Sequence, residues 1–547
     1  MLKVMRRLLI AVAVLLALLV AVVGASGYLL RGLVEGQREA LLAQLSRRAG
    51  VAIKVDRAEF DVAAWYQLRP ALALHGVKVS NPPGYKEPHL LTAERIDLRV
   101  ALRPLLERRL EVESLVLESP RFVVERNRQG ISNLETFSQG TGGESEAQGV
   151  ALRIQSLAVR KGDLRLAESA APRLREIDLA MSDVVPGQAI DSILKARLYD
   201  GKASSVSFAG KAGPFTENAA ALDGKAELTL ALADVPPAVR QRQFGSMLMN
   251  GVDKAVVRLT GTVKGDLYRA IAVAGRFAVE GMRVGRDASH LLPLDGQARL
   301  AATVTKLMST PTTSLQLREG LLKVGGGEWR GTVDLLMVGG VVRGKSTGTI
   351  AKLDINQFLG AFTTADNRMS GQLQMPSYSL RFAGRDADQL RRSLSGEAKV
   401  TVMQGRLKEL DMVASIRRAV ERTGFLEGDQ KDTDFTTLNT DLTLGGGRIT
   451  ASNLVIEGPA IAANGSGEIG EDQGLRFKLT TLVRGRVAEL LGQRKAGTQP
   501  AEAAIPVEIG GTVQNPRVTP NVGKMAVSTG LNYLQELLKK RLGGKTQ

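Results

Sequence analysis

Apolar and polar residues alternate with a period of two along much of this chain. In the segment RIDLRV, the apolar residues Ile96, Leu98 and Val100 are separated by Asp97 and Arg99. Because successive side chains of a β-strand point to opposite faces, this pattern predicts strands with one apolar and one solvated face. Apolar pairs two positions apart recur as far as IPVEI near residue 509. We therefore expect a mainly β protein.

Few helices are predicted to cover the apolar face of this sheet. Apart from a short helix expected near 32–49, the segments with helical spacing are 236–250, 354–362, 386–394 and 410–423. A sheet with one apolar face must bury that face against another layer, so the sheet is expected to cover itself. We predict a long, curved antiparallel β-sheet whose apolar face lines a groove. A self-packed sandwich without a ligand is the alternative.

Composition limits the partners and the chemistry. Lys and Arg exceed Asp and Glu by 73 − 56 = 17, which raises nucleic acid or anionic lipid as partners. The basic residues are scattered along the strands, and no basic stripe is interleaved with stacking aromatic residues, so we predict no nucleic-acid binding. The absence of Cys excludes disulfides, zinc–thiolate sites and a thiol nucleophile.

The sequence contains no arrangement of residues that indicates an enzyme. His75, His89 and His290 are far apart and form no metal-ligand pair. The glycine-rich segment 325–331 lacks the Lys and Ser or Thr of a phosphate-binding loop, and the chain has no nucleophile elbow at a strand-to-helix turn. We expect no catalytic residues, no metal and no cofactor.

Residues 8–30 form an uncharged apolar segment of 23 residues, long enough to span a bilayer, and Lys3, Arg6 and Arg7 precede it. A signal peptide cleaved near 24–26 is the competing interpretation, although its apolar region is normally only about 7–15 residues. We predict a single-pass anchor with a cytoplasmic N-terminus. The rest of the chain is then expected on the other side of the membrane.

We assign the anchor to residues 1–30. The rest of the chain divides into regions that differ in residue pattern and composition. We expect an N-terminal β-rich region over 31–137, a polar, glycine-rich linker over 138–149, a middle β-rich region over 150–394 and a C-terminal region over 395–521. A final segment covers 522–547.

The final segment has apolar residues at helical spacing, followed by the basic residues Lys539 to Arg541. Two roles are open for this predicted amphipathic helix: docking on a membrane or partner, or covering the edge of the last strand. The apolar residues are Val527, Leu531, Leu534, Leu538 and Leu542.

Two parts of the chain resemble the AsmA-like proteins of the Gram-negative envelope. Residues 77–137 are similar to the N-terminal signature of that family, with its recognisable points at Asn81, Gly130 and Asn133 and in the Pro-Pro-Gly that follows Asn81. The family often has Trp directly after the Asn that corresponds to Asn133, whereas this chain has Leu134 at that position. Three further segments follow in the order typical of the family's C-terminal region: 395–412, 445–470 and 505–521.

The resemblance implies an inner-membrane anchor and a periplasmic body, similar in architecture to TamB and the chorein-type bridge-like lipid transfer proteins. It also implies phospholipid as the partner, and a role in lipid transport to the outer membrane and in the integrity of that membrane. A trough lined by aliphatic side chains solvates acyl chains by about 0.8 kcal/mol per buried methylene.

The residues predicted to line the groove are Ile96, Leu98, Val100, Leu315, Leu317, Leu442, Leu444, Ile505, Val507 and Ile509. A second class of function is a scaffold or assembly factor that binds unfolded outer-membrane strands by edge pairing and takes up no lipid. Envelope proteins would be the partners in that case.

Overall fold

The computed structural model describes the greater part of the chain, namely residues 52–61, 69, 71–101, 103–104, 109–129, 131–133, 151–166, 173–215, 219–237, 240, 254–305, 311–363, 367–421, 432–484 and 502–521. The predicted anchor, the helix expected near 32–49, the linker 138–149 and the C-terminal helix lie outside these residues. Within the described part, no helix has the length and apolarity needed to cross a membrane.

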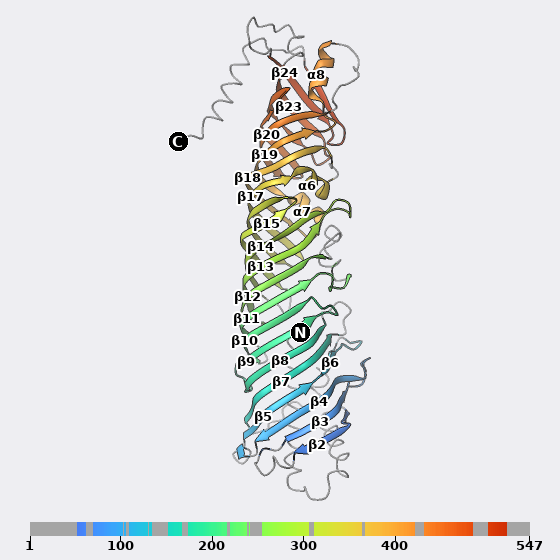
Figure 1. Ribbon diagram of the computed structural model, residues 1–547, viewed down its shortest axis with the longest axis vertical. Coiled ribbons are helices and arrows are strands. Elements are labelled where there is room, and N and C mark those ends of the chain that lie inside the picture. Colours follow the sequence, from blue (N-terminus) through green and yellow to red (C-terminus); the bar gives the residue numbers. More distant parts are fainter. Residues whose placement is uncertain are drawn as a thin grey trace, which may run out of the picture. The chain divides into compact units, whose positions relative to one another are not determined.

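The described residues are mainly β, as predicted, with 25 strands and three short helices (Figure 1). The chain divides into two compact units. The first contains Met1–Gln243, Val256–Phe277 and Leu300–Thr313, and the second contains Phe244–Ala255, Ala278–Arg299 and Ser314–Gln547. The boundary passes through three strands, β13 (Ala270–Val284), β14 (Leu292–Thr305) and β15 (Thr312–Val324).

The first unit contains twelve complete strands that pair into a sheet, mostly as consecutive antiparallel neighbours. Their bounds are β1 (Ile53–Lys54), β2 (Arg57–Asp61), β3 (Ala71–Ser80), β4 (His89–Ala101), β5 (Arg109–Glu118), β6 (Arg121–Val124), β7 (Ala151–Leu166), β8 (Leu174–Val184), β9 (Ile190–Leu198), β10 (Ser205–Phe215), β11 (Ala220–Ala231) and β12 (Val256–Asp266).

The prediction of a purely antiparallel sheet is wrong at β7. This strand pairs in parallel with both β5 and β6, which lie end to end along it and are separated by Ser119 and Pro120. Parallel neighbours cannot be joined by a tight hairpin, because the chain must return to the starting end of the first strand. Residues 125–150 supply the long connection that this return requires.

The second unit contains ten complete strands, each paired antiparallel with the next. They are β16 (Gly327–Val338), β17 (Val341–Asp354), β18 (Met369–Gly384), β19 (Ser395–Leu407), β20 (Thr433–Gly445), β21 (Arg448–Glu457), β22 (Ile461–Ile469), β23 (Leu475–Arg484), β24 (Glu502–Gly511) and β25 (Pro516–Pro520).

The three helices all lie in connections of the second unit. They are α6 (Ile355–Phe362), α7 (Ala387–Ser393) and α8 (Met412–Glu421), which confirms the helices predicted over 354–362, 386–394 and 410–423. Asp354 and Asp386 cap α6 and α7, and each side chain accepts a hydrogen bond from the backbone N–H three residues later. The predicted helix 236–250 lies almost wholly outside the described residues.

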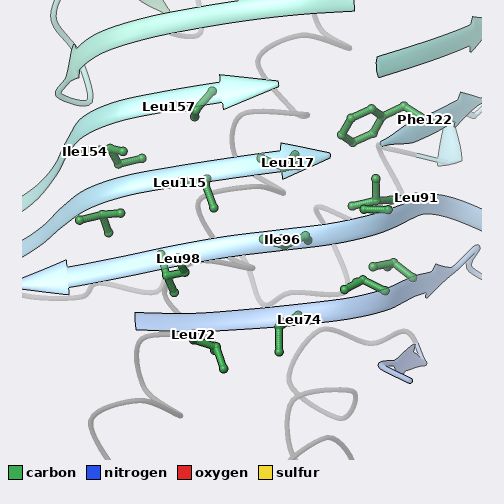
Figure 2. Close-up of a cluster of buried hydrophobic side chains, with 14 of the residues drawn as sticks. Leu72, Leu74, Leu91, Ile96, Leu98, Leu115, Leu117, Phe122, Ile154 and Leu157 are labelled. Atoms are coloured by element: carbon green, nitrogen blue, oxygen red, sulfur yellow. The ribbon is translucent and has the colours of Figure 1, made fainter. Parts of the chain in front are cut away.

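In each unit the alternating pattern places the apolar side chains on one face of the sheet. Figure 2 shows this face in the first unit, where side chains from β3 to β7 gather into a buried cluster. The largest fully buried side chains of the second unit include Leu353, Met412, Ile416 and Ile505, which belong to one buried cluster. Helix α8 therefore contributes to the apolar layer, because Met412 and Ile416 have no exposed surface.

Candidate functional site

The predicted groove residues lie on the apolar faces, but in separate places. Ile96, Leu98 and Val100 lie on β4 in the buried cluster of the first unit, and none is more than 2% exposed. Figure 2 shows Ile96 and Leu98 beside Leu115 and Leu117 of the neighbouring strand. These three predicted residues are therefore packed against other side chains of the same unit.

The other predicted residues belong to the second unit and to β15. Ile505, Val507 and Ile509 of β24 are buried in the large apolar cluster, and Leu442 of β20 packs against that cluster. Leu444 of β20 is half-buried, and so are Leu315 and Leu317 of β15. The structure brings the β24 residues together with Leu442, whereas the three β4 residues belong to the cluster of the other unit.

A less completely covered part of the apolar face lies on β10, β11 and β12 of the first unit. In β12 the side chains of Arg258, Thr260 and Thr262 are exposed, while Val257 and Leu259, which alternate with them, are half-buried. The same alternation continues over residues 208–211 of β10 and 222–228 of β11. We call the half-buried residues Val206, Phe208, Gly210, Leu222, Gly224, Ala226, Leu228, Val257, Leu259, Gly261 and Val263 the open tract.

The open tract is organised in rows that cross the three strands. Val206 pairs with Leu228, which pairs with Leu259 on the other side. A second row joins Phe208, Ala226 and Gly261, and a third joins Gly210, Gly224 and Val263. Neighbouring strands lie about 4.8 Å apart. Each row therefore offers a continuous apolar surface across the strands, with no polar side chain among its members.

Glycine occupies the middle of the open tract for a steric reason. A Cβ atom at Gly224 would lie 2.5 Å from the carbonyl oxygen of Ala209, and one at Gly261 would lie 2.2 Å from that of Ala274. No side chain fits at such distances, so neighbouring backbones approach here more closely than other residues allow. Bare backbone flanked by aliphatic side chains thus forms the middle of the open tract.

Sequence reasoning missed a buried polar network in the first unit. Glu125, only 5% exposed, accepts hydrogen bonds from Asn81 Nδ2 and from the backbone N–H groups of Lys86 and Glu87. Asn133 is fully buried, and its Oδ1 accepts from the Glu125 backbone N–H. A buried carboxylate is stable only with such partners, so this network holds the two ends of the signature segment together.

The second unit contains a hydrogen-bonded cluster of three side chains: Trp329, Ser346 and Tyr378. Trp329 of β16 donates a hydrogen bond from Nε1 to Tyr378 Oη of β18, and this hydroxyl lies 2.8 Å from Ser346 Oγ of β17. The indole ring lies over two glycines, since a Cβ at Gly320 would come within 2.6 Å of it and one at Gly331 within 2.9 Å. Three neighbouring strands are thereby joined through the buried side chains of Trp329 and Tyr378 and the half-buried Ser346.

Charged residues lie on the solvated faces, where many pair across strands. Glu468 of β22 accepts from Arg476 at 2.6 Å and from Arg448 at 3.0 Å, and the Arg476 hydrogen bond is the main cause of its lowered pKa. On β7 and β8, Asp183 accepts from Arg153 at 2.6 Å, and this bond lowers the carboxyl pKa. These exposed pairs lie on the solvated faces that the alternating pattern predicts.

The three histidines lie in different surroundings. His75 Nε2 lies 3.5 Å from Glu59, and His290 Nδ1 lies 2.8 Å from Asp287, whose pKa is lowered mainly by that hydrogen bond. His89 begins β4. Among the residues that the structure describes, no group of three His, Cys, Asp or Glu side chains is placed to hold a metal ion.

Comparison with known proteins gives a match over the N-terminal part of the chain. A family model described as YhdP protein matches residues 1–236, which include the N-terminal signature, the buried polar network and strands β10 and β11. No curated protein matches the chain, and no solved structure does. The first 236 residues are thus similar to the YhdP family, which supports the AsmA-like resemblance in its broad form.

Proposed function

We propose that this chain binds phospholipid acyl chains along the apolar face of its sheet and supports lipid transport to the outer membrane. The observation that carries the proposal is the open tract. A self-packed sandwich buries the apolar side chains between its two layers, yet those of the open tract on β10 to β12 are only half-buried. An aliphatic surface of this kind gains about 0.8 kcal/mol for each methylene that it removes from water.

The setting of this activity is part of the proposal. Residues 8–30 would anchor the chain in the inner membrane, with the N-terminus in the cytoplasm and the β-rich body in the periplasm. The role would be passive and non-enzymatic: acyl chains lie across the rows of the open tract, and lipid headgroups remain in water beside the charged faces. The similarity of residues 1–236 to the YhdP family is compatible with this role.

The rival role, binding of outer-membrane strands by edge pairing, has less support. The terminal strands of the described part are short, with two residues in β1 and five each in β2 and β25. Strand β25 also begins and ends with proline, which cannot donate a ladder hydrogen bond. Short, proline-containing edge strands are a known protection against strand addition.

Lipid occupancy of two matched variants tests the proposal. Ala226 lies in the open tract, whereas Ala209 is exposed on the other face of the neighbouring strand β10. Native mass spectrometry of the full chain should show bound phospholipid in the wild type and in Ala209→Asp. Ala226→Asp should lose it, because a carboxylate in an apolar surface repels acyl chains. A wild type without lipid, or equal occupancy in the two variants, would refute lipid binding by the open tract.

A further inference from the structure

The β16–β17 hairpin of the second unit has an unusual tip. Residues 335–342 read LLMVGGVV, eight residues without a charge or a polar side chain. Two other tight turns of the second unit are different: β22 and β23 are joined by GEDQG, and Arg448 follows the glycines between β20 and β21. Hairpin tips are usually polar because they face water. The composition of this tip therefore needs an explanation.

The tip also stands clear of its surroundings. Gly339 and Gly340 have φ angles of 56° and 79°, which indicates a two-residue turn of type I′ joining Val338 to Val341. No atom lies within 4 Å of the Cβ position of either glycine. Leu336 is 39% exposed and Val338 is 43% exposed, so two of the five exposed large apolar side chains in the described residues lie in this one hairpin. Packing within the unit does not account for them.

Cations gather on the same face beside the tip. Arg343 pairs with Leu336 across the hairpin, and Lys345 lies two residues further along β17. In the next strand Arg381 lies directly opposite Lys345. All three side chains are exposed. Like charges at directly opposed positions destabilise a sheet, and this arrangement is favourable when an anion lies over the pair.

The carboxylate that lies opposite Lys345 in the strand register is paired elsewhere. Asp334 lies opposite Lys345 in the strand register, but its carboxylate forms an ion pair at 2.6 Å with Arg318 of β15. Arg343, Lys345 and Arg381 take part in no ion pair within the described part of the chain. The surface therefore combines an exposed aliphatic tip with three positive charges that form no ion pair within the described residues.

We propose that this hairpin tip and its three cations form a docking surface for an anionic phospholipid bilayer. The aliphatic side chains would enter the interface between headgroups and acyl chains, while the cations contact lipid phosphates. A protein partner fits less well, because a stable protein interface buries roughly 1,200 Å² or more in total and the tip offers only a few side chains. The surface lies on the solvated side of the sheet, so this proposal does not depend on acyl chains lying on the apolar face.

A single fluorescent label tests this docking. The chain contains no cysteine, so Val338→Cys gives one labelling site for an environment-sensitive nitrobenzoxadiazole probe. Glu471→Cys, in the polar turn between β22 and β23, is the matched control, because Glu471 is exposed at another hairpin tip of the same unit. The full chain is held in phosphatidylcholine nanodiscs, so that residues 8–30 are already embedded. Vesicles containing phosphatidylglycerol are then added.

The probe at position 338 should shift to shorter wavelength and brighten on anionic vesicles, while the probe at 471 should not respond. Because each basic residue near an anionic surface adds about fivefold to binding, Lys345→Gln with Arg381→Gln should raise the half-saturating lipid concentration by roughly 25-fold. A silent probe at 338, an equal response at 471, or no effect of the double substitution would each overturn the proposal. Circular dichroism of the variants checks that the sheet is intact.

Discussion

Asn133 donates a hydrogen bond from Nδ2 to Asn81 Oδ1 at 2.8 Å, and the same nitrogen donates to the backbone carbonyl of Val123. The two asparagines are 52 residues apart, at opposite ends of the segment that resembles the AsmA-like signature. Both are joined to Glu125: Asn81 Nδ2 donates to its buried carboxylate, and Asn133 Oδ1 accepts from its backbone N–H. The signature residues are therefore explained by structure, because they satisfy one another's buried polar groups.

Replacing Asn133 with Ala should destabilise the first unit. The substitution removes one hydrogen-bond partner from each of three groups: the Val123 backbone carbonyl, the Glu125 backbone N–H and the side-chain Oδ1 of Asn81. Each buried polar group left unpaired costs about 1–3 kcal/mol. Urea unfolding followed by circular dichroism measures the change. Asn439→Ala is the control, because Asn439 is exposed and accepts one bond from Thr401. Equal losses in the two variants would contradict the network's importance.

The alternation of residues was sufficient to predict strands, but not how fully each is covered. Ile96 and Leu259 occupy the same kind of position in a period-two pattern, yet Ile96 is 1% exposed and Leu259 is half-buried. Periodicity is a local property of the chain, whereas coverage depends on which distant residues pack against a face. The candidate residues chosen from the pattern therefore include tightly packed core positions such as Val100.

Two other features depend on distant parts of the chain and escaped prediction. The parallel pairing of β5 with β7 depends on a long return connection, whose path has no periodic signal. Glu125 looks like a solvated carboxylate in the sequence, because its partners at Asn81 and Glu87 come 44 and 38 residues earlier. By contrast, one local irregularity is visible in the sequence: the apolar residues change phase near Ser114, from Leu110 and Val112 to Leu115 and Leu117, which indicates a β-bulge. The register shift between Arg99 and Val100 confirms it.

Tyr378→Phe should destabilise the second unit through Trp329. The substitution removes the hydroxyl that accepts from the Trp329 indole and leaves this buried N–H unpaired, which costs about 1–3 kcal/mol. Combining it with Ser346→Ala completes a double-mutant cycle, since Ser346 contacts the same hydroxyl. We expect the two free-energy changes to be less than additive in chemical denaturation. Strict additivity would mean that the three side chains do not act together.

The carboxylate of Glu468 should make stability depend on pH. Its folded-state pKa lies below the ordinary value of a Glu carboxyl group, chiefly because of the Arg476 hydrogen bond. A lowered folded pKa contributes stability that is fully present above the unfolded pKa and lost as pH falls through the folded pKa. Wild type should therefore be more stable than Glu468→Gln at pH 7, and the difference should vanish in acid.

Salt provides a separate check on Glu468, because the pair is exposed and its attraction is screened by ions. The difference in melting temperature between wild type and Glu468→Gln should shrink in concentrated sodium chloride at pH 7. A difference that persists unchanged in both acid and salt would show that Glu468 acts through packing, and not through its charge.

Lipid contact at the open tract can be measured directly by site-specific photo-crosslinking. A photoreactive benzoylphenylalanine at Leu259, which is half-buried on the apolar face, is compared in cells with one at the exposed neighbour Thr260 on the opposite face. We expect phospholipid adducts from position 259 and few or none from 260, because successive residues of a strand face opposite sides. Equal labelling at the two positions, or no adduct at 259, would contradict an acyl-chain-binding face.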